Sequence, residues 1–203
     1  MELNLRNQKQ GRGVGPVSKC VRGNSDLCMG CRTCLIACVE AHSKRPVFEM
    51  KPGELNFNPK LHMIKSFDIT VPFQCRHCEN PECIKACKKD AIFVDEEGRV
   101  LVDEEKCDGC MDCMEACPIG AIDMAPACLT EEGGEIKYVA NKCDLCKGVE
   151  GGPACIRVCP TDALRLVETS EVCDDTKLKR AGQMYKSAMI SGWLSKKKEQ
   201  NDE

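Results

Sequence analysis

Aromatic side chains are scarce in this sequence. Five Phe, two Tyr and one Trp make up 4% of its 203 residues. Aromatic rings supply much of the buried area of ordinary cores, so a conventional hydrophobic core is excluded. The length corresponds to one domain of ordinary size or two very small ones, and either arrangement needs another source of stability.

Several targeting and binding signals are also missing. The segment MELNLRNQKQGRGVGPVSK is polar and lacks the apolar core of a secretory signal. No apolar run approaches the ~18 residues that span a membrane, and a formal net charge of −3 leaves no basic excess for nucleic acid. Neither G-x-G-x-x-G nor G-x-x-x-x-G-K-[ST] is present. We therefore expect a soluble, cytoplasmic protein without a nucleotide site.

Cysteine, in contrast, is abundant, with 19 residues. Such a content indicates a chain held together by disulfides or metal. The odd number and the lack of a secretory signal count against disulfides, and in a reducing compartment this pattern is typical of metal binding or catalysis. The sequence therefore predicts a metalloprotein.

Most of the cysteines form four runs. Each run begins with C-x-x-C and ends with C-x-x-x-C, and the middle gap is two, four, two and eight residues in turn. The following residues also repeat, as in ACKKDAIFV, ACPIGAIDM and VCPTDALRL, which indicates an internal repeat. The runs are Cys28, Cys31, Cys34, Cys38; Cys75, Cys78, Cys83, Cys87; Cys107, Cys110, Cys113, Cys117; and Cys143, Cys146, Cys155, Cys159.

The third run, CDGCMDCMEACP, has the spacing of a 4Fe–4S ferredoxin. Three thiolates of one tight loop hold three corners of a cluster, and the fourth points toward the other cluster of a pair. The proline that follows stops the helical turn and fixes the exit of the chain. Paired C-x-x-C motifs in runs two and four are also typical of zinc, but the close spacing in runs one and three favours iron–sulfur clusters.

Longer motifs resemble a known family. Residues 75–123 resemble a bacterial two-cluster ferredoxin, and residues 25–170 resemble the four-cluster electron-transfer subunits of molybdenum or tungsten oxidoreductases and hydrogenases. The matching motifs are DLCMGCRTCLIACVEAH, QCRHCENPEC and KCDLC…GPACIRVCPTDAL. The family includes the beta subunits of formate dehydrogenase and dimethyl sulfoxide reductase. The soluble subunits of formate hydrogenlyase and of hydrogen-dependent carbon dioxide reductase are most similar, because no membrane anchor follows run four.

The resemblance implies four 4Fe–4S clusters, each held by three cysteines of one run and the last cysteine of another. Runs one and four exchange their last cysteines, and so do runs two and three. The implied ligand sets are Cys28, Cys31, Cys34, Cys159 (cluster 1); Cys38, Cys143, Cys146, Cys155 (cluster 2); Cys75, Cys78, Cys83, Cys117 (cluster 3); and Cys87, Cys107, Cys110, Cys113 (cluster 4).

The implied fold is α+β, with an inner ferredoxin-like lobe inserted into an outer one. The cysteine runs end in short helical turns. AIFV-DEEG-RVLV predicts a hairpin, HMIKSFDITVPF and EIKYVANKC predict strands, and residues 118–142 are expected to be mainly a connecting loop. The expected boundaries are an extension at 1–24, the outer lobe at 25–70 and 138–170, the inner lobe with its loop at 71–137, and a C-terminal amphipathic helix at 171–203.

Residues beside the runs are expected to be bystanders, because sixteen thiols already complete four clusters. Lys88 and Lys89, which follow Cys87, are expected to be solvated rather than aimed at a cluster. Hydrogen bonding or surface positions are expected for the three histidines. The bystanders are Cys20, Cys128, Cys173, His42, His62 and His77.

The C-terminal segment has an apolar stripe at helical spacing. Docking on another subunit or self-assembly is the first hypothesis. Trp193 beside Lys196–Lys198 suggests membrane-surface binding, and folding back over the lobes is the third reading. The stripe comprises Leu178, Ala181, Tyr185, Ala188, Met189 and Trp193.

The function expected from these features is electron transfer without catalysis. The resemblance implies a subunit that connects a molybdenum or tungsten formate dehydrogenase or carbon dioxide reductase-type subunit to a hydrogenase, a related ferredoxin-like subunit or another acceptor. The alternative within this class is the corresponding subunit of a membrane-tethered respiratory reductase. The competing class is a zinc module.

Overall fold

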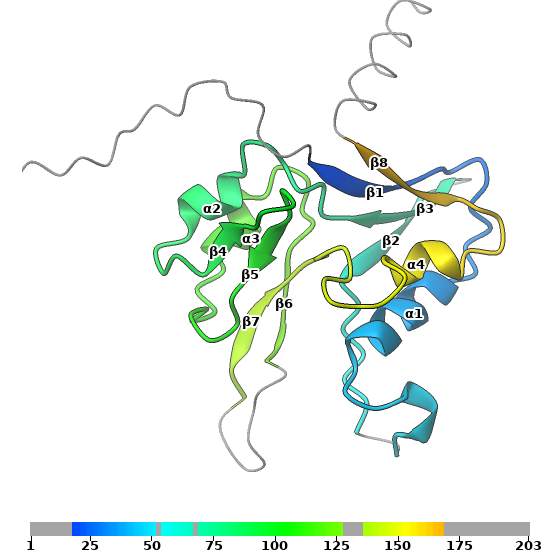
Figure 1. Cartoon of the computed structure of the whole chain (residues 1–203), viewed down its shortest axis with the longest axis horizontal. Coiled ribbons are helices and arrows are strands. Elements are labelled where there is room, and N and C mark those ends of the chain that lie inside the picture. Colours follow the sequence, from blue (N-terminus) through cyan, green and yellow to red (C-terminus); the bar gives the residue numbers. More distant parts are fainter. Residues whose placement is uncertain (1–17, 52–53, 67–68, 128–135, 169–203) are drawn as a thin grey trace, which may run out of the picture. The chain divides into compact units, whose positions relative to one another are not determined.

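The computed structural model describes residues 18–51, 54–66, 69–127 and 136–168 (Figure 1). The C-terminal helix expected at 171–203, Cys128 and Cys173 lie outside these residues. The described elements are β1 (Lys19–Gly23), α1 (Thr33–His42), η1 (Val47–Glu49), β2 (Leu61–Ser66), β3 (Ile69–Gln74), α2 (Glu82–Ala86), β4 (Ile92–Val94), β5 (Val100–Val102), α3 (Asp112–Ala116), β6 (Asp123–Pro126), β7 (Tyr138–Asn141), α4 (Ala154–Arg157) and β8 (Leu164–Glu168).

The described strands form small two-stranded sheets, which pair β1 with β8, β2 with β3, β4 with β5 and β6 with β7. Helix α1 packs against α4, and α2 packs against α3 (Figure 1). The combination of short helices and small sheets is consistent with the expected α+β class. Strand β1 falls within the expected extension at 1–24, yet it pairs with the last strand of the expected outer lobe.

The predicted hairpin between runs two and three is confirmed. Strands β4 and β5 are antiparallel, with Ile92 opposite Val102 and Val94 opposite Val100. Gly98 has a φ of 76°, a left-handed conformation that glycine adopts without steric cost. Its N–H donates to the Asp95 carbonyl at 3.0 Å, which closes the acidic turn.

Two other strand predictions were incomplete. The segment before run two holds two strands, since β2 and β3 are antiparallel from Leu61 opposite Gln74 to Ser66 opposite Ile69. Apolar and polar residues alternate across the reversal, so periodicity alone could not reveal it. Within the expected loop 118–142, β6 pairs with β7. Strand β6 was missed because its sequence, DMAP, contains two poor strand formers, aspartate and proline.

The predicted helical turns in the cysteine runs are confirmed, with one difference in length. Helix α1 has ten residues and continues past Cys38, where Val39 stands in place of proline. Helix α2 is five residues long and ends before Cys87, although Lys88 follows. Proline is therefore not required to end these turns.

The buried core combines cysteines with aliphatic side chains, and no Phe, Tyr or Trp is among the buried residues that the structure describes. One buried cluster combines Val21, Leu61 and Leu164 with cysteines of runs one and four. A second combines Ile92 and Val100 with cysteines of runs two and three. The expected shortage of aromatic packing is thus visible in the buried residues.

Candidate iron–sulfur cluster sites

The structure brings the cysteine runs together in pairs. Cys34 and Cys38 of run one lie in one group of buried core side chains with Cys155 of run four, while Cys143 and Cys159 pack at the edge of this group. The second group of core side chains contains cysteines of runs two and three only, namely Cys83, Cys87, Cys107, Cys113 and Cys117. The packing of α1 on α4 and of α2 on α3 produces this arrangement.

Two small cavities are each lined by three cysteines of one run and the last cysteine of its partner run. Their enclosed volumes are small, about 20 and 10 Å³, and both open to solvent. Apolar side chains such as Met63 and Leu164 complete the first cavity, and Ile92 and Met124 complete the second. The cysteines are Cys28, Cys31, Cys34 and Cys159 in the first, and Cys87, Cys107, Cys110 and Cys113 in the second.

Electrostatic coupling also links thiols of the paired runs. Charges on Cys75 and Cys117 raise the pKa of Cys83, after the larger effect of burial. Burial is again the larger cause for Cys155, whose pKa rises to about 12, and charges on Cys38 and Cys146 add to it. The coupled thiols are Cys75, Cys78, Cys83 and Cys117 of runs two and three, and Cys34, Cys38, Cys143, Cys146 and Cys155 of runs one and four.

Burial keeps these thiols protonated in the absence of a cation. It is the main reason why the pKa of Cys34, Cys83 and Cys113 rises to about 11. Because only the thiolate ligates metal, binding must displace protons and supply the missing positive charge. Metal binding at these buried thiols is therefore coupled to the release of their protons.

Backbone N–H groups already point at several of the sulfur atoms. The shortest is Ala163 N to Cys159 Sγ at 3.2 Å, and Ala121 N donates to Cys117 Sγ at 3.3 Å. Lys60 N lies 3.3 Å from Cys38 Sγ. Such donors stabilise a thiolate and tune the metal that it binds.

The family comparison agrees with this chemistry. A family model described as a 4Fe–4S dicluster domain matches residues 67–169. The chain belongs to this 4Fe–4S dicluster family. The four thiols at each of the two cavities, together with the N–H donors on the sulfur atoms, fit clusters of this type.

Named relatives connect this dicluster chain with electron transport. Electron transport protein HydN of Escherichia coli (strain K12) is 36% identical over 162 residues, which cover 77% of this chain and 91% of HydN. Formate hydrogenlyase subunit 2 of the same strain is 33% identical over 189 residues, covering 81% and 89%. The chain is thus a member of a family of iron–sulfur electron-transport proteins.

A longer relative contains a similar segment. AegA of Escherichia coli (strain K12), named as an oxidoreductase, is 38% identical over 152 residues. The alignment covers 74% of this chain but only 22% of AegA. The dicluster chain therefore spans less than a quarter of that relative.

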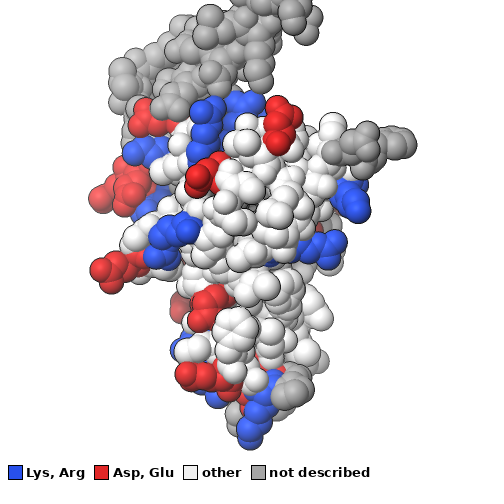
Figure 2. Space-filling view, turned by 90° about the vertical axis from the view of Figure 1, so that its right-hand side faces the viewer, with Lys and Arg blue, Asp and Glu red and all other residues white. Residues whose placement is uncertain are grey.

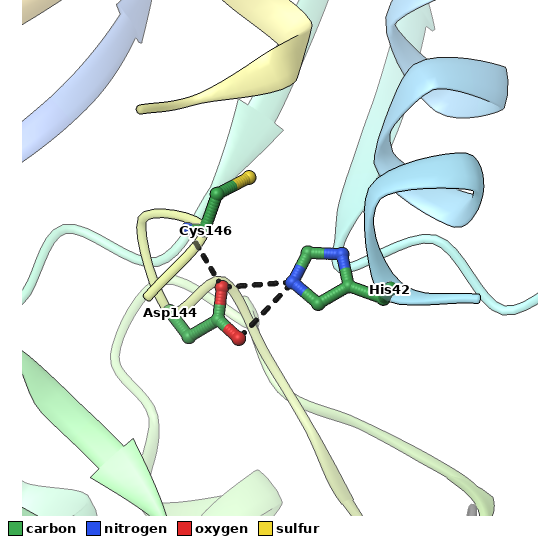
Figure 3. A group of neighbouring side chains, drawn as sticks. All are labelled: His42, Asp144 and Cys146. Carbon is green, nitrogen blue, oxygen red and sulfur yellow. Dashed lines mark hydrogen bonds and ion pairs between the residues drawn. The ribbon is translucent and has the colours of Figure 1, made fainter. Parts of the chain in front are cut away.

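An ion pair joins the end of α1 to the loop of run four (Figure 3). His42 Nε2 lies 3.0 Å from Asp144 Oδ1, and His42 Nδ1 lies 2.7 Å from the Cys38 carbonyl oxygen. Burial opposes protonation of His42, but the bonds to Asp144 and Cys38 outweigh it and raise its pKa. Asp144 also accepts a hydrogen bond from the Cys146 N–H at 2.8 Å. The His42–Asp144 ion pair therefore connects Cys38 of run one with Cys146 of run four.

The ligand atoms of His42, Asp144 and Cys146 lie within 4.8 Å of one another, as in a metal site. Both nitrogens of the His42 ring, however, face oxygen acceptors. An imidazole that donates from both nitrogens has no lone pair for a metal. The sequence prediction that His42 is a hydrogen-bonding residue is therefore confirmed.

The remaining side chains singled out in the sequence also have clear positions. His77 is fully buried, and this burial is the main reason why its pKa falls to about 3. Lys88 is 83% exposed, as expected, and pairs with Asp112 at 3.0 Å. Lys89 is 55% exposed and pairs with Asp108 at 3.3 Å, but it also lines the second cavity. Cys20 is buried in β1, where burial raises its pKa.

On the face drawn in Figure 2, basic and acidic side chains are interspersed, with an uncharged area between them. This face has no continuous basic field, in agreement with the charge balance of the sequence. Among the described residues, no helix is long and apolar enough to cross a membrane.

Gly109, in the loop of run three, allows a close approach to β7. Its φ is +78°, and an added Cβ would lie 2.7 Å from the Tyr138 carbonyl oxygen. Gly120 has a φ of +61° and open space around it. We expect Gly109→Ala to lower the free energy of unfolding by at least ~1 kcal/mol more than Gly120→Ala. Both substitutions place alanine in a left-handed backbone conformation, but only the Cβ added at Gly109 collides with backbone atoms. Anaerobic thermal unfolding measures the difference, and equal melting temperatures contradict the prediction.

Proposed function

We propose that this chain is a non-catalytic electron-transfer subunit that carries four 4Fe–4S clusters in two ferredoxin-like lobes. The proposed ligand sets are those implied by the resemblance. They are Cys28, Cys31, Cys34, Cys159; Cys38, Cys143, Cys146, Cys155; Cys75, Cys78, Cys83, Cys117; and Cys87, Cys107, Cys110, Cys113.

The observation that carries this proposal is the cross-pairing of the runs. Each of the two small cavities combines three cysteines of one run with one from its partner run, which is the arrangement that paired clusters require. When bound, the clusters accept and release single electrons. The chain contributes the thiols, the N–H donors to sulfur and an apolar lining that limits access of water.

The partners are proposed from the named relatives. Formate hydrogenlyase subunit 2 and HydN support a relay between a molybdenum or tungsten formate dehydrogenase or carbon dioxide reductase-type subunit and a hydrogenase or related ferredoxin-like subunit. We place this complex in the cytoplasm. Residues 171–203 are proposed to dock on a partner subunit or to drive higher-order assembly.

An anaerobic pull-down of the full-length tagged chain from its native host tests these partners. Mass spectrometry is expected to identify a formate dehydrogenase-like subunit together with a hydrogenase subunit. Recovery of a multi-span membrane subunit instead moves the chain to a membrane-tethered respiratory reductase. Recovery of neither contradicts both assignments of the complex.

A further inference from the structure

A buried lysine lies between cysteine groups of the inner and outer lobes. Lys142 immediately precedes Cys143 and is only 2% exposed. Its Nζ donates to the carbonyl oxygens of Cys143, at 2.8 Å, and of Val100 in β5. Within the part of the chain that the structure describes, no carboxylate oxygen lies within 4.0 Å of this ammonium group.

The same peptide group of Val100 connects Lys142 to run two. The Val100 N–H donates to His77 Nδ1 at 3.0 Å, while the Val100 carbonyl accepts from Lys142. His77 stands between Cys75 and Cys78, and its own N–H lies 3.4 Å from Cys75 Sγ. A series of buried hydrogen bonds therefore connects the second cysteine run, through β5, with the start of the fourth.

The charge of Lys142 acts on thiols of both run two and run four. It lowers the pKa of Cys83 in run two and of Cys143 in run four, in each case against the larger, raising effect of burial. Lys142 is thus close enough to both groups to favour negative charge on either.

A buried cation without an acidic partner is costly unless negative charge lies nearby. Asp144 and Asp95 act on His77 together with this lysine, so some negative charge lies nearby. On the proposed function a 4Fe–4S cluster with four thiolate ligands adds a net charge of about −2. The attraction is mutual. A fixed positive charge stabilises the reduced, more negative form of a cluster and raises its reduction potential.

We propose that Lys142 is a positioning residue that raises the reduction potentials of two clusters at once, one in each lobe. On the proposed function, on which this inference rests, they are the clusters at the groups containing Cys83 and Cys143. The one charge shifts both potentials in the same direction.

An EPR-monitored redox titration of the full-length, cluster-loaded protein tests this inference. Lys142→Gln removes the charge and keeps a hydrogen-bond donor, so two of the four midpoint potentials are expected to fall while the other two stay unchanged. Cys83→Ala and Cys143→Ala identify the two signals, each by the loss of one. Lys85→Gln is the matched control, because Lys85 lies on α2, is 53% exposed and pairs with Glu82. It is expected to shift none.

Unchanged potentials in an iron-loaded Lys142→Gln variant overturn the inference. If that variant does not load, Lys142→Arg must restore loading, because arginine keeps the charge. Failure of Lys142→Arg means that the shape of lysine matters rather than its charge, which also overturns the inference. A wild-type protein without 4Fe–4S signals refutes the proposed function itself and is a distinct result.

Discussion

Removal of iron and sulfide from the loaded protein is expected to abolish its cooperative thermal unfolding and its resistance to proteases. The reason is the composition of the two groups of buried core side chains, in which cysteines pack with Val, Leu and Ile. When a metal site holds the core together, the free energy of metal binding is largely folding free energy.

Local structure cannot replace the clusters in this protein. Helices α2 and α3 have five residues and α4 has four, whereas isolated helices shorter than ~12 residues are marginal in water. The described sheets are two-stranded, and isolated hairpins are also marginal. Neither kind of element is expected to persist once the thiols lose their metal.

Anaerobic treatment with a chelator and reductant, followed by circular dichroism and limited proteolysis, measures this loss. Reconstitution with iron and sulfide is the control and is expected to restore both properties. A stripped protein that keeps a cooperative transition near that of the loaded form contradicts the account, since its apolar contacts alone would then suffice.

The second large effect concerns the exchange of cysteines between runs. Cys117→Ala, at the end of run three, is expected to release the cluster held by run two. Thiol alkylation of the anaerobic protein should then label Cys75, Cys78 and Cys83, because a 4Fe–4S cluster that loses a ligand becomes labile. The other three thiols of run three should stay protected by the cluster that they share with Cys87.

Cys87→Ala is the reciprocal variant and is expected to expose Cys107, Cys110 and Cys113 instead. Cys20→Ala is the control, since this buried cysteine lies outside the runs although the charges of Cys75 and Cys78 act on it. A bystander at this position predicts unchanged labelling. Mass spectrometry of the labelled peptides reads all three results. If Cys117→Ala exposes the thiols of run three itself, the clusters are held within single runs and the cross-pairing is wrong.

Local sequence patterns predicted many of the elements of this protein. The long-range contacts between them could not be predicted from the sequence. Cysteine spacing identified the runs, and the β-branched and apolar arms around the acidic turn with Gly98 identified the β4–β5 hairpin. Strand β6 was missed because Asp123 and Pro126 favour other conformations. The reversal between β2 and β3 leaves no mark on the periodicity.

Two features of the site depend on residues far apart in the chain. His42 and Asp144 are separated by 102 positions, and no local pattern indicates their pairing. Lys142 is buried although lysine is among the residues most often exposed. Its position follows from contacts with β5 that only the folded chain reveals.

The most direct test of the central claim is the metal and labile sulfide content of the full-length chain, purified without oxygen. Four 4Fe–4S clusters predict about sixteen iron and about sixteen sulfide atoms per chain, with EPR signals that appear on reduction. About eight of each, or zinc without labile sulfide, contradicts the account.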